Sequence, residues 1–248
     1  LNLGKYRFEV IDRRTNKVIY SRGFASIYGE WETTAEYREI YRSFRESLRF
    51  PWPKVPVQVV VKARDADNSF HQRWSTVIAP SSRFVNPRDR APDGEVWPIF
   101  ESGPPSEKVD LLVIGEGYTA EEMPKFHADA TRLVTALLEE EPFRSRRDDC
   151  NVGGRDLPAA ESGVTRPRAG EFRRTPLSAQ YNIFDSERYV LTYANRALRD
   201  VASAAPYEFL ETCLVTRSRS GELVKGLPNN NHNTGQNSDS RQYRRQNS

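Results

Sequence analysis

The sequence is poor in the residues that most often bind metals or act as nucleophiles. Its 248 residues include three histidines, two cysteines and one methionine. Two thiols, Cys150 and Cys213, cannot build a disulfide framework or a four-ligand zinc site, and they leave the redox compartment undecided. No run approaches the roughly twenty apolar residues of a membrane helix. The composition therefore excludes a disulfide scaffold and predicts no membrane span.

The sequence also lacks a concentration of positive charge over residues 1–216. The net charge is +3, yet residues 217–248 alone carry six basic and two acidic side chains. The other residues sum to −1, so the basic isoelectric point comes from the end of the chain. Nucleic-acid binding loses its electrostatic support, and we predict no nucleic-acid partner.

Residues 1–100 show the alternation of apolar and polar side chains that is typical of strands. Residues 5–24 predict a hairpin that turns at Thr15-Asn16-Lys17, and residues 55–63 and 74–78 predict two further strands. Between them, Thr33 and Glu36 have the spacing of a capping box. Apolar side chains after this box fit either a helix or a strand, and we favour a short helical turn followed by a strand over 44–50.

A linker rich in proline and charge follows over residues 80–108, and Gly103-Pro104-Pro105 marks the predicted domain boundary. All four tryptophans precede this boundary. Their rings could stack on sugars, but positions in the core or on a hairpin face are the commoner roles, and we favour these. They are Trp31, Trp52, Trp74 and Trp97.

After the linker the pattern changes to α/β. Residues 109–114 predict a buried strand, and Phe126, Ala130 and Val134 begin a helical stripe that continues through Leu138. A second helix is expected over 182–205, with an irregular segment over 153–175. From residue 226 the chain has almost nothing apolar, and we predict disorder. The predicted domains are 1–100, 101–215 and a disordered tail, 216–248.

The turn that follows the strand reads GEGYT and raises the possibility of a phosphate site. Phosphate loops need more glycines, as in GxGxxG, or a lysine, and neither is present. Glu116 would repel an anion. Thr119 and Glu122 form a capping box, which explains the start of the helix. We interpret the turn as structural.

The histidines do not form a zinc motif. His71, His127 and His232 are too far apart in sequence to share a helical face, and His-Glu-x-x-His is absent. Each is more simply explained as a solvated or capping side chain. We assign no metal, cofactor or catalytic residue.

The sequence also predicts no nucleophilic site and no acid–base pair. GxSxG is absent, and Cys150 has arginines nearby but no assignable histidine partner. The acidic runs Glu121-Glu122 and Glu139-Glu140-Glu141 lie at opposite ends of one helix and are typical of a solvated face.

Five blocks of the sequence, in order within residues 4–210, carry a more specific signal than any single motif. They are SRGFASIYGEWETTAEYR, LLVIGEGYTAEEMPKFHADATRL, EEPFRSRRDDCNV, AAESGVTRP and SERYVLTYANRALRDVASAAPYEFL. Together they resemble the IgA peptidase M64 family of bacterial zinc metallopeptidases. The resemblance implies an α+β protein: an N-terminal β-sandwich-like domain followed by a zincin-like α/β domain. It also implies a secreted or envelope location, protein or peptide substrates, and zinc bound by a later HExxH-like helix with a glutamate base.

The sequence departs from that pattern after Leu210, where the resemblance implies a strand and a glycine-rich turn that lead into the zinc helix. We therefore expect an incomplete zincin-like domain, truncated or frame-shifted over residues 211–248, and a chain that starts inside the N-terminal domain. Gly153-Gly154-Arg155 also stands where an apolar strand is expected. No zinc ligand or catalytic residue is carried over.

Three hypotheses follow. The first is a truncated metallopeptidase that is inactive because HExxH is missing. The second is a secreted binding module whose N-terminal domain recognises a glycan or a protein surface. The third, ranked last, is an independent enzyme that uses the 153–175 loop, with Glu161 and Arg166 meeting an anionic substrate.

Overall fold

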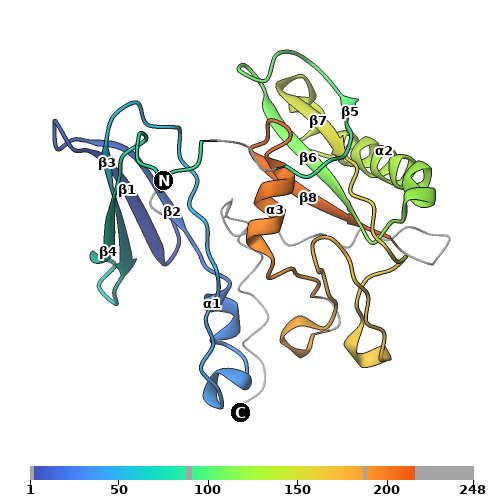
Figure 1. Ribbon diagram of the computed structural model, residues 1–248, viewed down its shortest axis with the longest axis horizontal. Coiled ribbons are helices and arrows are strands. Elements are labelled where there is room, and N and C mark those ends of the chain that lie inside the picture. The colour runs from blue at the N-terminus through green and yellow to red at the C-terminus, as the bar shows by residue number, and fades with distance from the viewer. Residues whose placement is uncertain (1–2, 88–90, 187–188, 216–248) are drawn as a thin grey trace, which may run out of the picture.

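The computed structural model describes residues 3–87, 91–186 and 189–215. These residues form two four-stranded sheets that lie on opposite sides of the molecule (Figure 1). The first sheet has the order β2-β1-β3-β4 and the second has the order β5-β7-β6-β8. The protein is therefore α+β with a β-rich N-terminal part, as predicted. The predicted tail after residue 215 and His232 lie outside the described residues.

The first sheet is antiparallel and consists of two hairpins. The predicted hairpin is confirmed as β1 (Tyr6–Asp12) and β2 (Val18–Phe24), and β3 (Val57–Arg64) pairs with β1. The fourth strand, β4 (Phe70–Ile78), begins earlier than predicted. One face of the sheet is apolar and buries Phe8, Val10, Phe24, Val57 and Val59.

The chain between β2 and β3, which we call the covering segment, packs on this apolar face in place of a second sheet. It starts with α1 (Tyr28–Trp31) and a 3-10 turn at Glu36–Arg38, and the 44–50 stretch has no regular structure, so the predicted strand is wrong there. Leu48 and Phe50 pack on the sheet face instead. Their side chains contact the core while the backbone stays out of any ladder. Among the described residues the N-terminal part is thus one covered sheet, and a sandwich partner stays a prediction.

The second sheet lies between two helices. The strands β6 (Val109–Glu116), β7 (Cys150–Arg155) and β8 (Phe209–Leu214) are parallel, and β5 (Val96–Phe100) pairs antiparallel with β7. Helix α2 (Met123–Glu139) covers one face with the predicted apolar stripe, and α3 (Asn195–Ala202) covers the other. Strand β5 precedes Gly103-Pro104-Pro105 in the chain and belongs to this sheet through its pairing with β7.

Two predictions for the second sheet and its helices, which we call the second unit, are wrong; the first sheet with its covering segment is the first, N-terminal unit. The sequence predicts an irregular segment from Gly153, but Gly153-Gly154-Arg155 forms the end of β7. The indole of Trp97 there fills the space that a side chain at Gly154 would occupy. Among the described residues of the 182–205 range, the expected α-helix is limited to α3. Asn182, Phe184 and Asp185 adopt positive φ angles, which are incompatible with a right-handed helix.

The tryptophans divide between core and surface. Trp31 is buried, as the core interpretation predicts, and Trp97 packs against the α2 core. Trp74 is 53% exposed on β4 of the β3–β4 hairpin, which fits the hairpin-face prediction. Trp52 is 59% exposed and lies outside the strands, so the prediction is wrong for it. No helix of the described residues is long and apolar enough to cross a membrane.

The covering segment also joins the two units. The Arg49 guanidinium donates a hydrogen bond of 2.8 Å to the carbonyl of Tyr207 and lies 3.9 Å from the Tyr207 ring centroid. The rings of Phe44 and Tyr193 lie 5.9 Å apart. Burial lowers the pKa of Arg49, although Tyr207 opposes this effect. These contacts attach the first sheet to the α3 side of the second.

Candidate functional site

Parallel strands place their carboxyl ends at one edge of a sheet, and in open α/β sheets ligands bind at that edge, where the strand order reverses. Here the edge lies at the ends of β6, β7 and β8, with β6 in the centre. The side chains there are therefore the first candidates for a functional site.

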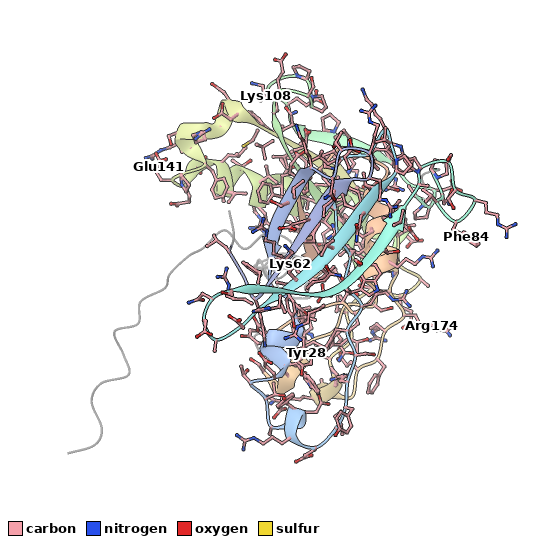
Figure 2. The ribbon with its side chains drawn as sticks, turned by 90° about the vertical axis from the view of Figure 1, so that its left-hand side faces the viewer. Tyr28, Lys62, Phe84, Lys108, Glu141 and Arg174 are labelled. Atoms are coloured by element: carbon pink, nitrogen blue, oxygen red, sulfur yellow. The ribbon has the colours of Figure 1, made fainter. Side chains whose placement is uncertain are left out.

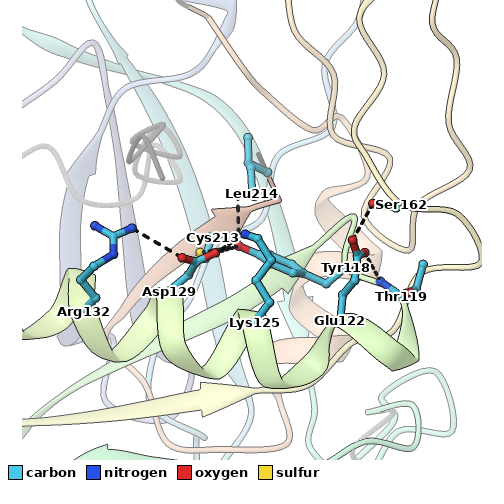
Figure 3. Close-up of polar contacts among 9 residues, drawn as sticks. All are labelled: Tyr118, Thr119, Glu122, Lys125, Asp129, Arg132, Ser162, Cys213 and Leu214. Carbon is cyan, nitrogen blue, oxygen red and sulfur yellow. Dashed lines mark hydrogen bonds and ion pairs between the residues drawn. The ribbon is translucent and has the colours of Figure 1, made fainter. Parts of the chain in front are cut away.

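The GEGYT turn after β6 is occupied by the protein's own groups. Gly117 has a φ of +79°, and its carbonyl accepts a hydrogen bond of 2.9 Å from the amide of Gly163. The predicted capping box is present, with the Thr119 amide 3.0 Å from the Glu122 carboxylate. Ser162 donates to the same carboxylate at 2.9 Å (Figure 3). The turn thus docks the following loop, which supports its structural interpretation.

Tyr118 forms a buried polar cluster behind this turn (Figure 3). Its hydroxyl lies 3.1 Å from the Asp129 carboxylate and 3.3 Å from the Cys213 sulfur. Lys125 bonds Asp129 at 2.5 Å. Burial raises the pKa of Tyr118 far above its ordinary value, and Cys213 adds to that shift. The phenol therefore stays protonated, as a structural donor and not a base.

The two cysteines are both unsuited to nucleophilic attack. Burial raises the pKa of Cys213. Burial also raises the pKa of Cys150, and the neighbouring Asp149 carboxylate adds to the effect. A raised pKa reduces the thiolate fraction at neutral pH, and the thiolate is the reactive form.

Glu116 is fully buried at the end of β6 and organises the loop that returns over the sheet. It accepts hydrogen bonds from the Thr175 hydroxyl at 2.5 Å, the Ala179 amide at 3.0 Å and the Leu177 amide at 3.2 Å. Burial raises the pKa of Glu116, and these three donors oppose the increase. From the sequence, the charge of Glu116 predicts only that the side chain would repel an anion. Its role as a loop anchor carries no sequence signal.

The polar cluster that comes nearest to a catalytic arrangement joins α2 to the end of β7. The Nε2 atom of His127 lies 2.8 Å and 3.1 Å from the two carboxylate oxygens of Asp156. Trp97 donates from its indole nitrogen to the same carboxylate at 2.8 Å, and its ring centroid lies 4.2 Å from that of His127. The pair therefore fastens edge strand β5 to α2. Asp156 was not singled out by the sequence, because a lone aspartate has no motif.

The described residues do not form a site for a zinc ion, the cofactor that the resemblance implies. His71 lies on β4 in the first sheet, bonded to Asp65 at 2.6 Å, whereas His127 lies on α2 beside the second sheet. Within the described ranges, no three His, Cys, Asp or Glu side chains are grouped so that they could hold a metal ion. Zinc sites use three or four such ligands.

The loop of the third hypothesis does not bring its two candidates together. Glu161 is bonded to Arg173 at 3.4 Å, whereas the Arg166 guanidinium lies 4.6 Å from the ring centroid of Tyr181. Both side chains make contacts within the loop region, and neither adjoins the His127–Asp156 pair in any observed contact.

Comparison with known families gives two matches along the chain. The model of the peptidase M64 N-terminus matches residues 1–75, and the model of IgA peptidase M64 matches residues 97–223. No curated protein matches the chain. The two family models follow one another in the order that the sequence blocks predicted and cover most of the 248 residues. The second match continues past Leu210 to residue 223, and β8 extends to Leu214, so the predicted departure from the family is wrong for residues 211–223. The chain therefore belongs to the IgA peptidase M64 family.

Proposed function

We propose that this chain is a member of the M64 family that does not hydrolyse peptides by itself. The family is generally zinc-dependent and acts on proteins or peptides. The supporting observation is the absence of His-Glu-x-x-His from all 248 residues. In zinc peptidases this motif supplies two ligands and the general base that activates water.

The positions of the histidines support the same proposal. His71 and His127 belong to different units, and each is paired with a single carboxylate. Tyr118 and the thiols do not offer a replacement nucleophile, because their pKa values are raised. The second unit then serves as a folded scaffold of the family without its reaction centre.

The test combines zinc analysis with a peptidase assay on the full purified chain. We expect substoichiometric zinc after dialysis against micromolar zinc, and no cleavage of an unstructured protein substrate. The matched variants are His127→Ala and His71→Ala. Stoichiometric zinc together with cleavage that a chelator abolishes would overturn the proposal, and loss of both in one variant would locate the site.

A second candidate function is a binding module in the N-terminal unit, for a glycan or a protein surface. The exposed rings of Trp52 and Trp74 favour it, because large exposed aromatics on a folded domain often mark recognition surfaces. Glycan arrays and protein pull-downs with the full chain test it. Trp52→Ala and Trp74→Ala should each reduce retention, and unchanged retention in both would count against the module.

The resemblance alone supports a secreted or envelope location for the protein, which we also propose. Fractionation of the cells that produce it, with an antibody against this chain, tests the location. Recovery only in the cytosol would contradict it.

A further inference from the structure

We propose that the outer edge of β4 and the groove at its end bind an extended, acidic polypeptide segment. The segment would pair with β4 as an added strand and place an apolar side chain in the groove. This inference rests on the second candidate function, the N-terminal binding module, and names its partner. It does not depend on whether the chain hydrolyses peptides.

The first observation is the open edge of the N-terminal sheet. Strand β4 is nine residues long and ends the order β2-β1-β3-β4, so it pairs with β3 alone among the described strands. Figure 2 shows it as the last strand of the sheet, with Phe84 beyond its end. An edge strand presents a row of unpaired backbone N–H and C=O groups, which an extended peptide can satisfy.

The second observation is an apolar groove where β4 ends. Its volume is about 610 Å³, and it lies between the covering segment and the chain after β4. Trp52 and Phe84 line it and are 59% and 85% exposed, and Val77 of β4 is 51% exposed. An added strand would bring a side chain to this groove, because alternate residues of a strand point to the same side. Covering these apolar groups would be favourable.

The third observation concerns charge. The two stretches that include the groove, residues 47–58 and 70–85, contain no aspartate or glutamate. Their basic residues are Arg49, Lys54, Arg73 and Arg83. Arg49 is engaged by Tyr207, so the other three supply the charge that a ligand would meet. Opposite charge in the partner would speed association and select against basic segments.

Two other occupants fit less well. A glycan needs several hydrogen-bonding groups around its stacking rings, whereas the groove is lined by proline, valine, isoleucine and aromatic side chains with few polar ones. A second copy of the chain would bring two basic edges together, which like-charge repulsion disfavours.

The experiment uses fluorescence anisotropy with the full chain and a labelled, end-blocked peptide that alternates glutamate and valine around a central leucine. The first comparison peptide carries lysine in place of each glutamate, and the second is N-methylated along its backbone. We expect the glutamate peptide to bind, with affinity that falls as salt rises. The lysine peptide should bind at least about tenfold more weakly, and the N-methylated peptide should not bind.

Variants locate the site on the protein. Trp52→Ala and Phe84→Ala should each weaken binding about tenfold, since buried aromatic anchors dominate interface energies. Tyr41→Ala removes a fully exposed ring that does not line the groove and should leave affinity unchanged. Because Trp52 and Phe84 are exposed, these variants should fold, which circular dichroism checks.

Several results would overturn the inference. They are equal binding of the lysine or N-methylated peptide, no effect of either aromatic variant, absence of peptide binding, and concentration-dependent dimers that use this edge. If glycans or folded proteins are retained while the peptide is not, the inference fails but the binding module stands. If nothing is retained, both fail.

Discussion

Removing the buried carboxylate of Glu116 should destabilise the second unit strongly. Glu116→Ala deletes the acceptor for three donors, of which the Leu177 and Ala179 amides cannot turn to other partners. The Thr175 hydroxyl can rotate toward another acceptor, so losing its hydrogen bond to Glu116 costs less free energy. An orphaned buried donor costs about 1–3 kcal/mol, and two give about 2–6 kcal/mol. Natural domains have stabilities of about 5–15 kcal/mol, so the loss is a large share.

The pH dependence of Glu116→Gln tests the same site in another way. Burial raises the pKa of Glu116, so the folded state holds its proton more tightly than the unfolded state. The stabilisation of the folded state that this pKa shift provides is fully present below the unfolded pKa, about 4.3. It is lost as the pH rises through the higher folded pKa. The stability of the wild type relative to Glu116→Gln should therefore decrease as the pH rises above about 4.3.

Urea denaturation followed by far-UV circular dichroism measures both effects. The matched control is Glu121→Ala, an exposed carboxylate near the same turn, which should change the free energy of unfolding by less than about 0.5 kcal/mol. A loss of under about 1 kcal/mol for Glu116→Ala would show that the loop does not depend on this anchor. A wild-type advantage over Glu116→Gln that grows with pH would refute the assigned direction of the pKa shift.

Three further substitutions or reactions probe other contacts. Gly154→Ala would place a Cβ 2.3 Å from the Trp97 indole, and should cost about 1–3 kcal/mol by urea denaturation; a neutral effect would mean that the ring moves freely. Arg49→Ala removes the contacts to Tyr207 and should increase the radius of gyration in small-angle X-ray scattering. An unchanged radius would show that other contacts hold the units together. Cys213 is buried with a raised pKa, so it should react with a thiol reagent only after unfolding, and fast labelling of the native protein would contradict this.

Elements whose signals are local can be predicted from the amino-acid sequence alone. The alternation over residues 5–24 gave the β1–β2 hairpin, and the 3.6-residue spacing from Phe126 to Leu138 gave α2. Thr119 and Glu122 predicted a capping box that is present. Each of these patterns is decided by neighbours within a few positions, so they can be predicted without knowledge of the fold.

Features that depend on residues distant in sequence follow only from the folded arrangement. Gly154 lies in a strand, and the ring of Trp97, which is distant in sequence, fills the space beside it that a side chain would otherwise occupy. The spacing of apolar residues over 44–50 fits both a helix and a strand, but the stretch has no regular structure. Its apolar side chains pack on the first unit, whereas Arg49 bonds Tyr207 of the second. The pairing of His127 with Asp156 likewise arises only when β7 ends beside α2. Backbone conformation at such positions follows from contacts that no local pattern records.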